Sequence, residues 1–447
     1  MIENAMSVLK KDDNIIKNIN YIWGLAIVDI IAYCVADQTS LLSYGYSLLL
    51  LIICSFFISK HEKKDLFFAF HFYVFFAIVI YSVLLYIYPE YMGLNGGDYV
   101  MDDHRFYAQI VDGRVSYISE GSIVAKYPYS IFLSLIYPFY VYTPLNIVTL
   151  NVIFLAFLPI FTRRLSLLLT GDSQVGYYAF IYSMLCPFTL YFGCLILREA
   201  FTAWMVIMGM CCYLEKKYIP LSLCVSMLVW IRFGTLVFLI CGIILLLRFQ
   251  MERSIRRDFY FSVAIILVIV TFFFFFDVIQ EFSGGKLEDS IIRSTDNGRY
   301  ADSTIGALMK MPFPLNIFFS TLFFLFIPFL IIPNMDIEQI SIPVFFQGFL
   351  TPIFMFFLWN YAFNASLVAI YEKHAEGVKK ILYMSLIFAL LLGTISMQSR
   401  HKTVLFPIMC MLAAYGKVNY NKKYNHISLL MAFIVIGVQL MYGLFHL

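Results

Sequence analysis

Long apolar runs constrain this sequence more than any other feature. Residues 41–59, 67–88 and 259–276 match the roughly 20 apolar residues that an α-helix needs to cross a bilayer. Hydrophobic residues make up 62% of the chain and charged residues 13%, against about 25% in an ordinary soluble domain, so lipid must be its main solvent. We expect an all-α polytopic integral membrane protein with about 10 to 13 transmembrane helices. No repeat or low-complexity linker divides residues 1–447, which we treat as a single transmembrane domain.

Positive charge is distributed unevenly between the two sides of the membrane. When loops are assigned to alternate sides, most of the 31 lysines and arginines, including Arg163 and Arg164, fall on the side of the N-terminus. The positive-inside rule makes that side cytoplasmic. The other basic residues fall on the outer side: Arg105, Arg114, Lys126, Arg198, Arg232, Lys286, Arg293, Arg299, Lys310, Arg400 and Lys402. The net charge of +3 is too small to indicate a nucleic-acid partner.

Three regions leave the path of the chain open. Residues 219–248 hold Arg232 in the middle of an apolar run, which fits two short spans that turn at Arg232 better than one long span. Residues 127–143, rich in Tyr and Pro, fit a helix lying in the outer interface at least as well as a span. The same two alternatives apply to residues 313–341.

Acidic side chains gather in the first large outer loop, residues 89–126. Asp98, Asp102 and Asp103 lie close to His104 and Arg105 in the sequence. Carboxylates beside an imidazole suit general-base catalysis on a hydroxyl, or the binding of a divalent cation. A divalent cation is the one cofactor for which the loop offers ligands, and the sequence leaves open whether one is needed. A solvated polar loop without chemistry is an equal alternative.

Arginine recurs in segments predicted to face the outer side. The candidates are Arg198, Arg232, Arg293, Arg299 and Arg400, with Arg293 and Arg299 in the second large outer loop, residues 278–312. Glu199 and His401 stand next to two of them as supporting residues. Planar guanidinium groups bind phosphate or diphosphate through two parallel hydrogen bonds, so the set predicts an anionic ligand. For Arg198 and Glu199 alone, a structural ion pair is the favoured alternative.

One carboxylate, Asp29, lies in the middle of the first predicted span. A carboxylate at that depth is costly enough to be a functional candidate. We favour a hydrogen-bonded or neutral Asp that holds two helices together, because no second mid-span charge is evident to pair with it.

Several segments together resemble bacterial C-superfamily glycosyltransferases and the related O-antigen or oligosaccharide repeat-unit polymerases. The family pattern of an acidic outer loop, a Tyr-Pro segment and a helix ending in arginines reads here as GGDYVMDDHRFY, KYPYSIFLSLIYPFYVYTPLNIVTLN and TRRLSLLLTG. LREAFTAW is similar to the Arg-Glu helix start of these families, IRFGT to the arginine after it, and SRHKTVLFPIMCMLAAYG to their late outer arginine. These segments cover somewhat under half of the chain.

The resemblance implies a fold like that of C-superfamily glycosyltransferases and an enzyme of the bacterial cytoplasmic (inner) membrane. Such an enzyme takes saccharides from an undecaprenyl or other polyprenyl phosphate or diphosphate at the outer face, in the synthesis of lipopolysaccharide or another surface polysaccharide. Donor and acceptor are lipid-linked, and a chain-length regulator is an implied partner. An Asp of residues 89–126 would deprotonate the acceptor hydroxyl, and outer arginines would stabilise the leaving group.

Three functions stay open at this point. The first is a polymerase of repeat units, and the second is a polyprenyl-phosphate-dependent transferase of single sugars. The third is a lipid or sugar transporter, which is disfavoured because the arginines keep to one face and no internal repeat is visible.

Overall fold

The computed structural model of the chain describes residues 15–16, 18–56, 58–87, 128–137, 144–250, 259–260, 262–263, 266–267, 270, 311–312, 314–326, 330, 344–372, 375–393 and 399–445. Its main helices are α2 (Asn20–Ala36), α3 (Leu41–Ser55), α4 (Lys63–Ile87), α7 (Pro128–Ile136), α8 (Pro144–Thr170), α9 (Ser173–Leu185), α10 (Pro187–Gly193), α11 (Glu199–Leu214), α12 (Tyr218–Gln250), α17 (Leu315–Phe326), α18 (Thr351–Tyr371), α19 (Glu376–Leu391), α20 (Leu405–Val418) and α21 (Asn425–Phe445). Short segments are η1 (Gln38–Ser40), η4 (Val344–Leu350), η6 (Ser399–Val404) and η7 (Lys422–Tyr424).

The helices have the length and the surface of membrane-spanning segments. Within the described residues, five helices are long and apolar enough to cross a membrane, or six if the bent pair α9–α10 counts as one span. Four shorter apolar helices, α2, α3, α11 and α17, accompany them. The outward faces of α2 and α21 expose large apolar side chains such as Val35, Phe433 and Ile434, which water would not favour but lipid does. These helices confirm the prediction that the chain is an α-helical polytopic membrane protein.

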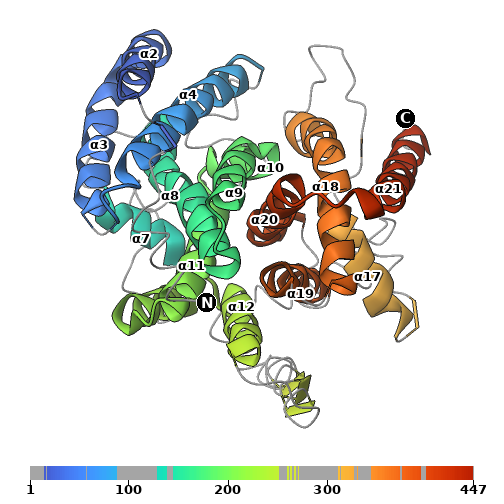
Figure 1. Cartoon of the computed structure of the whole chain (residues 1–447). Coiled ribbons are helices and arrows are strands. Elements are labelled where there is room, and N and C mark those ends of the chain that lie inside the picture. The colour runs from blue at the N-terminus through green and yellow to red at the C-terminus, as the bar shows by residue number, and fades with distance from the viewer. Residues whose placement is uncertain are drawn as a thin grey trace.

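Helix α8 forms the centre of the N-terminal half. Its side chains are buried along the membrane-crossing stretch, and α3, α4, α9 and α11 pack around it. Figure 1 shows α2, α3 and α4 on one side of α8, and α17 to α21 as a second group on the other side of the molecule. Contacts of α9 with α20, of α11 with η6 and of α12 with α19 join the two groups.

Small residues allow the closest of these helix contacts. A Cβ atom added to Gly416 of α20 would lie 1.9 Å from the carbonyl oxygen of Tyr361 in α18. Backbone cannot yield as a flexible side chain can, so only glycine fits at this crossing. Gly437 of α21, by contrast, has open space around it.

Helix α12 is interrupted at Arg232, whose backbone is extended (φ −161°, ψ 87°). Beyond that point α12 runs along α11: Leu239 lies against Gly209, and the hydroxyl of Tyr213 donates to Gln250 Oε1 at 3.3 Å. A straight helix of 33 residues would be about 50 Å long, well over the hydrocarbon thickness of about 30 Å. Although α12 counts as one of the five long helices by length and composition, it consists of two shorter segments that turn at Arg232, as predicted.

Residues 127–143 hold the short helix α7, of 9 residues, about 14 Å long. That length is too small to cross a bilayer, so the interfacial alternative is favoured for this segment. Tyr129 and Leu133 are buried against the helices beneath. In the region 313–341, helix α17 has 12 residues, and most of the residues after it lie outside the described part of the chain.

Candidate functional site

Arg232 and Glu199 form an ion pair where α11 begins and α12 is interrupted. Arg232 Nη1 lies 3.0 Å from Glu199 Oε1. The Glu199 side chain is 1% exposed, whereas that of Arg232 keeps 14% exposure. Arg198, half-buried, directly precedes Glu199 as the N-cap residue of α11. We call this region, with η6, the Arg198 end of the bundle.

The loop that carries Arg198 is fixed by an asparagine of α8. Asn151 Nδ2 donates to the backbone carbonyls of Gly193 (3.0 Å) and Leu195 (2.6 Å). The hydroxyl of Tyr129 in α7 donates in turn to Asn151 Oδ1. A buried amide that makes these hydrogen bonds holds the loop in one conformation. The backbone position from which the Arg198 side chain extends is therefore fixed. Sequence reasoning noted the Tyr-Pro segment around Tyr129 but not this role.

Aromatic side chains close in sequence to the ion pair pack against one another. The Phe201 ring lies 5.2 Å from that of Phe132 and 5.8 Å from that of Trp204, and Phe132 meets Trp230 edge-on at 6.3 Å. Phe201 and Trp230 are close in sequence to Glu199 and Arg232 respectively. Apolar surroundings exclude water, so charges near them interact more strongly than they would in solvent.

Segment η6 packs against α10 and α11, the two helices on either side of Arg198. The backbone of Arg400 and His401 is thereby brought to the Arg198 end. His401 is partly buried, and the side chain of Arg400 lies outside what the structure describes.

Lys402, in the same segment, is 1% exposed. Its Nζ donates to the carbonyl of Leu325 at 3.1 Å and lies 5.0 Å from the ring centre of Phe406. Burial lowers the pKa of Lys402 well below its usual value, and the Cys186 thiol nearby opposes this shift. Lys402, which the sequence identified only as an outer charge, therefore ties η6 to α17.

The remaining predicted site residues are not placed. Asp98, Asp102, Asp103, His104 and Arg105, together with Arg293 and Arg299, lie outside the described residues. The structure therefore brings together Arg198, Glu199 and Arg232, with η6 beside them, and leaves the predicted general base and the second-loop arginines untested. Among the residues that are described, no group of three or more His, Cys, Asp or Glu side chains could hold a metal ion.

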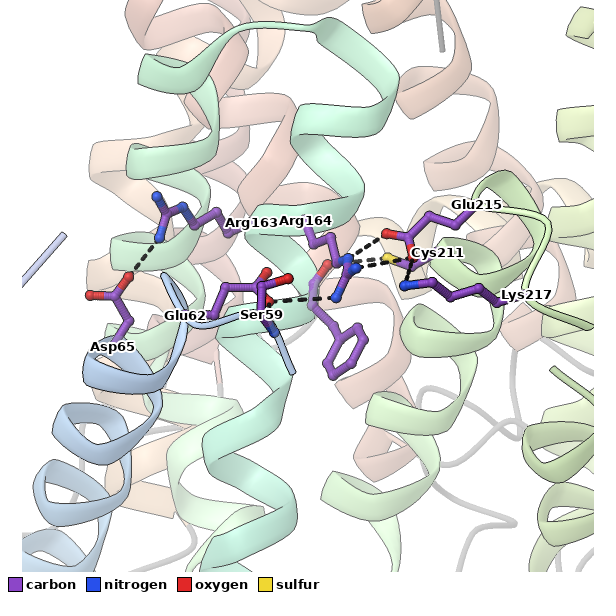
Figure 2. A network of polar contacts seen from close by, with 9 residues as sticks. Ser59, Glu62, Asp65, Arg163, Arg164, Cys211, Glu215 and Lys217 are labelled. Atoms are coloured by element: carbon purple, nitrogen blue, oxygen red, sulfur yellow. Dashed lines mark hydrogen bonds and ion pairs between the residues drawn. The ribbon is translucent and has the colours of Figure 1, made fainter. Parts of the chain in front are cut away.

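A second charged cluster lies about 24 Å away, at the other end of the 16-residue helix α11 (Figure 2). Arg164 donates through Nε and Nη2 (3.0 Å) to the two carboxylate oxygens of Glu215, and its Nη1 lies 3.5 Å from Glu62 Oε2. Lys217 Nζ lies 2.7 Å from Glu215 on the outside. We call this cluster, with Arg163 and Asp65, the basic-end network.

The same network holds the first described residues of the chain. Arg163 Nη1 lies 2.6 Å from Asp65 Oδ2, and both side chains are buried. The Asp65 carboxylate also accepts from the backbone N–H groups of Ile15 (3.2 Å) and Ile16 (2.9 Å). Sequence reasoning saw the basic residues here but not the carboxylates that neutralise them.

In comparison with known proteins, no family model, no curated protein and no solved structure matches the chain. Its class therefore rests on the fold and the two charged clusters. The chain is a polytopic α-helical membrane protein with a buried ion network at one end and an arginine–glutamate cluster at the other.

Proposed function

We propose that the chain is a membrane glycosyltransferase that uses polyprenyl-phosphate- or diphosphate-linked saccharides at the non-cytoplasmic face, and that it polymerises repeat units. The observation that carries this proposal is the place of Arg232 at the Arg198 end. Arg232 pairs with the buried Glu199 where α12 is interrupted, and its side chain keeps 14% exposure. In the proposed site the exposed part of this guanidinium group also binds the phosphate of the ligand, next to Arg198 at the start of α11.

Arginine suits such a ligand for geometric reasons. Its planar guanidinium group donates two parallel hydrogen bonds to phosphate and keeps its charge in a partly buried site. The carrier is a lipid and arrives from within the bilayer, so a nucleotide-binding fold is not required. The packed aromatic side chains that include Phe201 and Trp230 are close in sequence to Glu199 and Arg232. Apolar surroundings of this kind strengthen the stabilisation of charge that develops on a leaving phosphate.

The acceptor hydroxyl needs a base, and the proposal assigns this role to Asp98, Asp102 or Asp103. The alternative is a divalent cation held by the same carboxylates, which would activate the acceptor hydroxyl in place of a general base. Both assignments come from the carboxylates and the imidazole gathered in residues 89–126, and the resemblance adds the acceptor hydroxyl as the group acted on.

The genetic test is deletion in the bacterial host, followed by electrophoresis of the surface polysaccharide. Loss of the ladder with a single repeat retained is expected, and complementation with Arg232→Gln should fail where Arg248→Gln restores the ladder. Arg248 is the matched control because it lies on the same helix, in its last turn. An intact ladder after deletion would overturn the polymerase proposal.

A direct test uses the purified protein with a polyprenyl diphosphate probe. Arg198→Gln and Arg232→Gln each remove charge-assisted hydrogen bonds worth about 1.5–3 kcal/mol, so each should weaken binding about 10- to 100-fold. Unchanged binding by both folded variants would show that the arginines serve structure alone. If binding falls but only one sugar is added per acceptor, the single-sugar transferase is the correct alternative.

One observation favours transport as a second candidate. The α9–α10 span is bent by 55° at Cys186, and broken helices are typical of transporter binding sites. Reconstituted vesicles loaded with a lipid-linked saccharide test it. Transport that persists in Asp102→Asn, Asp103→Asn and Arg198→Ala would reverse the order of the two proposals.

A further inference from the structure

A second titratable pair lies inside the membrane domain, away from both charged clusters. His71 Nδ1 of α4 lies 2.7 Å from Asp29 Oδ2 of α2, and the two side chains are 4% and 0% exposed. The expectation that Asp29 has no mid-span partner was wrong, because His71 is hidden in an aromatic run of the sequence. The expectation that Asp29 holds two helices together was correct.

The pair is deep along both helices. Asp29 lies about 14 Å from the start of α2 and His71 about 12 Å from the start of α4, at 1.5 Å per residue. Neither side chain reaches water from that depth. Asp29 Oδ1 is buried and has no hydrogen-bond partner among the described residues.

Among the described residues, phenol groups and no further formal charge face the pair. Tyr44 of α3 places its hydroxyl 3.2 Å from His71 Nδ1, and the Tyr33 ring of α2 lies 5.1 Å from that of Tyr44 at a tilt of 40°. From α8 the facing group is the hydroxyl of Thr149, which pairs with the Tyr33 hydroxyl.

The other carboxylates on these two helices are already engaged. Asp37, at the end of α2, accepts from Ser40 Oγ at 2.6 Å. Asp65, earlier on α4, is paired with Arg163. Within the described part of the chain, the Asp29–His71 pair therefore balances its charge by itself.

Charge balance fixes how many protons such a pair holds. With one proton it is neutral, whether as carboxylate with imidazolium or as carboxylic acid with imidazole. Without the proton it carries −1, and with two it carries +1; either net charge is expensive in a buried, lipid-surrounded site. In the carboxylate–imidazolium form Nδ1–H donates to Asp29, and the Tyr44 hydroxyl oxygen lies within reach as a second acceptor.

We propose that Asp29 and His71 form an intramembrane proton-binding site, which holds one shared proton through the pH range in which a free histidine releases its own. Proton release then requires α2 to separate from α4, so a movement that breaks the Asp29–His71 contact is coupled to a proton. This inference is independent of the proposed transferase activity.

The test is the pH dependence of reversible unfolding in detergent micelles. In the native protein the folded state keeps the proton and the unfolded state loses it above about pH 6.5. Its unfolding constant should therefore rise up to tenfold per pH unit above that point. In Asp29→Asn the folded His71 stays neutral, so the unfolding constant should instead rise as the pH falls below about 6.5.

The matched control is Asp37→Asn on the same helix, which should keep the native profile. If native protein and Asp29→Asn have the same pH profile, the proposal is wrong. A profile that depends on Na⁺ concentration at fixed pH would also overturn it, in favour of a metal-cation site. Should the variant fail to fold, nitrogen NMR of the native imidazole decides: an unchanged His71 signal from pH 6 to 9 is expected, and titration near pH 6.5 like a free histidine contradicts the proposal.

Discussion

Glu215 has one buried and one exposed cationic partner, which allows a test of what the basic-end network contributes. Both partners are at hydrogen-bond distance, but the Arg164 side chain is 10% exposed and that of Lys217 is 52% exposed. Removing Arg164 leaves Glu215 and Glu62 buried without their shared cation, which costs about 3–5 kcal/mol. Removing Lys217 breaks a solvent-screened pair worth about 0–1 kcal/mol. Burial, and not distance, should therefore rank the two variants.

A double-mutant cycle measures this difference. Arg164→Met and Lys217→Met are each made alone and together with Glu215→Gln, and the free energy of unfolding of every variant is measured in detergent micelles. We expect a coupling energy above about 2 kcal/mol for Arg164 and below about 1 kcal/mol for Lys217. Raising the salt from 0.1 to 1 M shortens the Debye length from about 10 to about 3 Å, which should abolish the Lys217 coupling and spare that of Arg164. Equal costs for the two variants, or an Arg164 coupling lost in salt, would refute the reasoning.

Three further outcomes are expected. Gly416→Ala should lower the melting temperature by several degrees or prevent folding, because its Cβ would overlap a backbone carbonyl, while Gly437→Ala has no effect; equal effects contradict the packing argument. Tyr129→Phe should cost about 1–3 kcal/mol of stability by leaving the buried Asn151 amide oxygen unsatisfied, and should reduce ligand binding at Arg198 with it. Lys402→Met should be more stable than the native protein at neutral pH. Because the folded-state pKa of Lys402 is lowered, the native protein gains stability as the pH rises toward about 10.4, so the difference should shrink between pH 7 and 9.

Features that depend on local composition were predictable from the sequence. The apolar runs predicted the helices, and the arginine in the middle of residues 219–248 predicted the interruption at Arg232, because a cation at that depth requires either a partner or a turn. Assigning Arg198, Glu199 and Arg232 to one side of the membrane agrees with the Arg232–Glu199 contact, but the sequence did not predict which arginine pairs with Glu199.

Partners that lie far apart in the chain were not predictable. His71 is surrounded in sequence by Phe and Tyr residues, and nothing local connects it with Asp29. The Asn151 contacts with the α10–α11 loop depend in the same way on how α8 packs. A lone histidine or asparagine in an apolar span is nevertheless a usable signal, since a polar group in lipid must find a partner on a neighbouring helix.

The two ends of α11 show why arginine alone does not identify a ligand site. At the basic-end network, the cations Arg163, Arg164 and Lys217 are matched by equally many carboxylates of that network, so no charge is left for an anion. At the Arg198 end, Arg232 pairs with Glu199 at a chain reversal, where its side chain keeps some exposure. The proposed function requires this partly exposed arginine to contact a phosphate as well, a role that the buried Arg164 does not have. An uncharged replacement at each end separates the two roles. Arg164→Met should reduce the free energy of unfolding, with little effect on the affinity of the folded protein for a diphosphate probe. Arg232→Gln should reduce that affinity much more than Arg164→Met does.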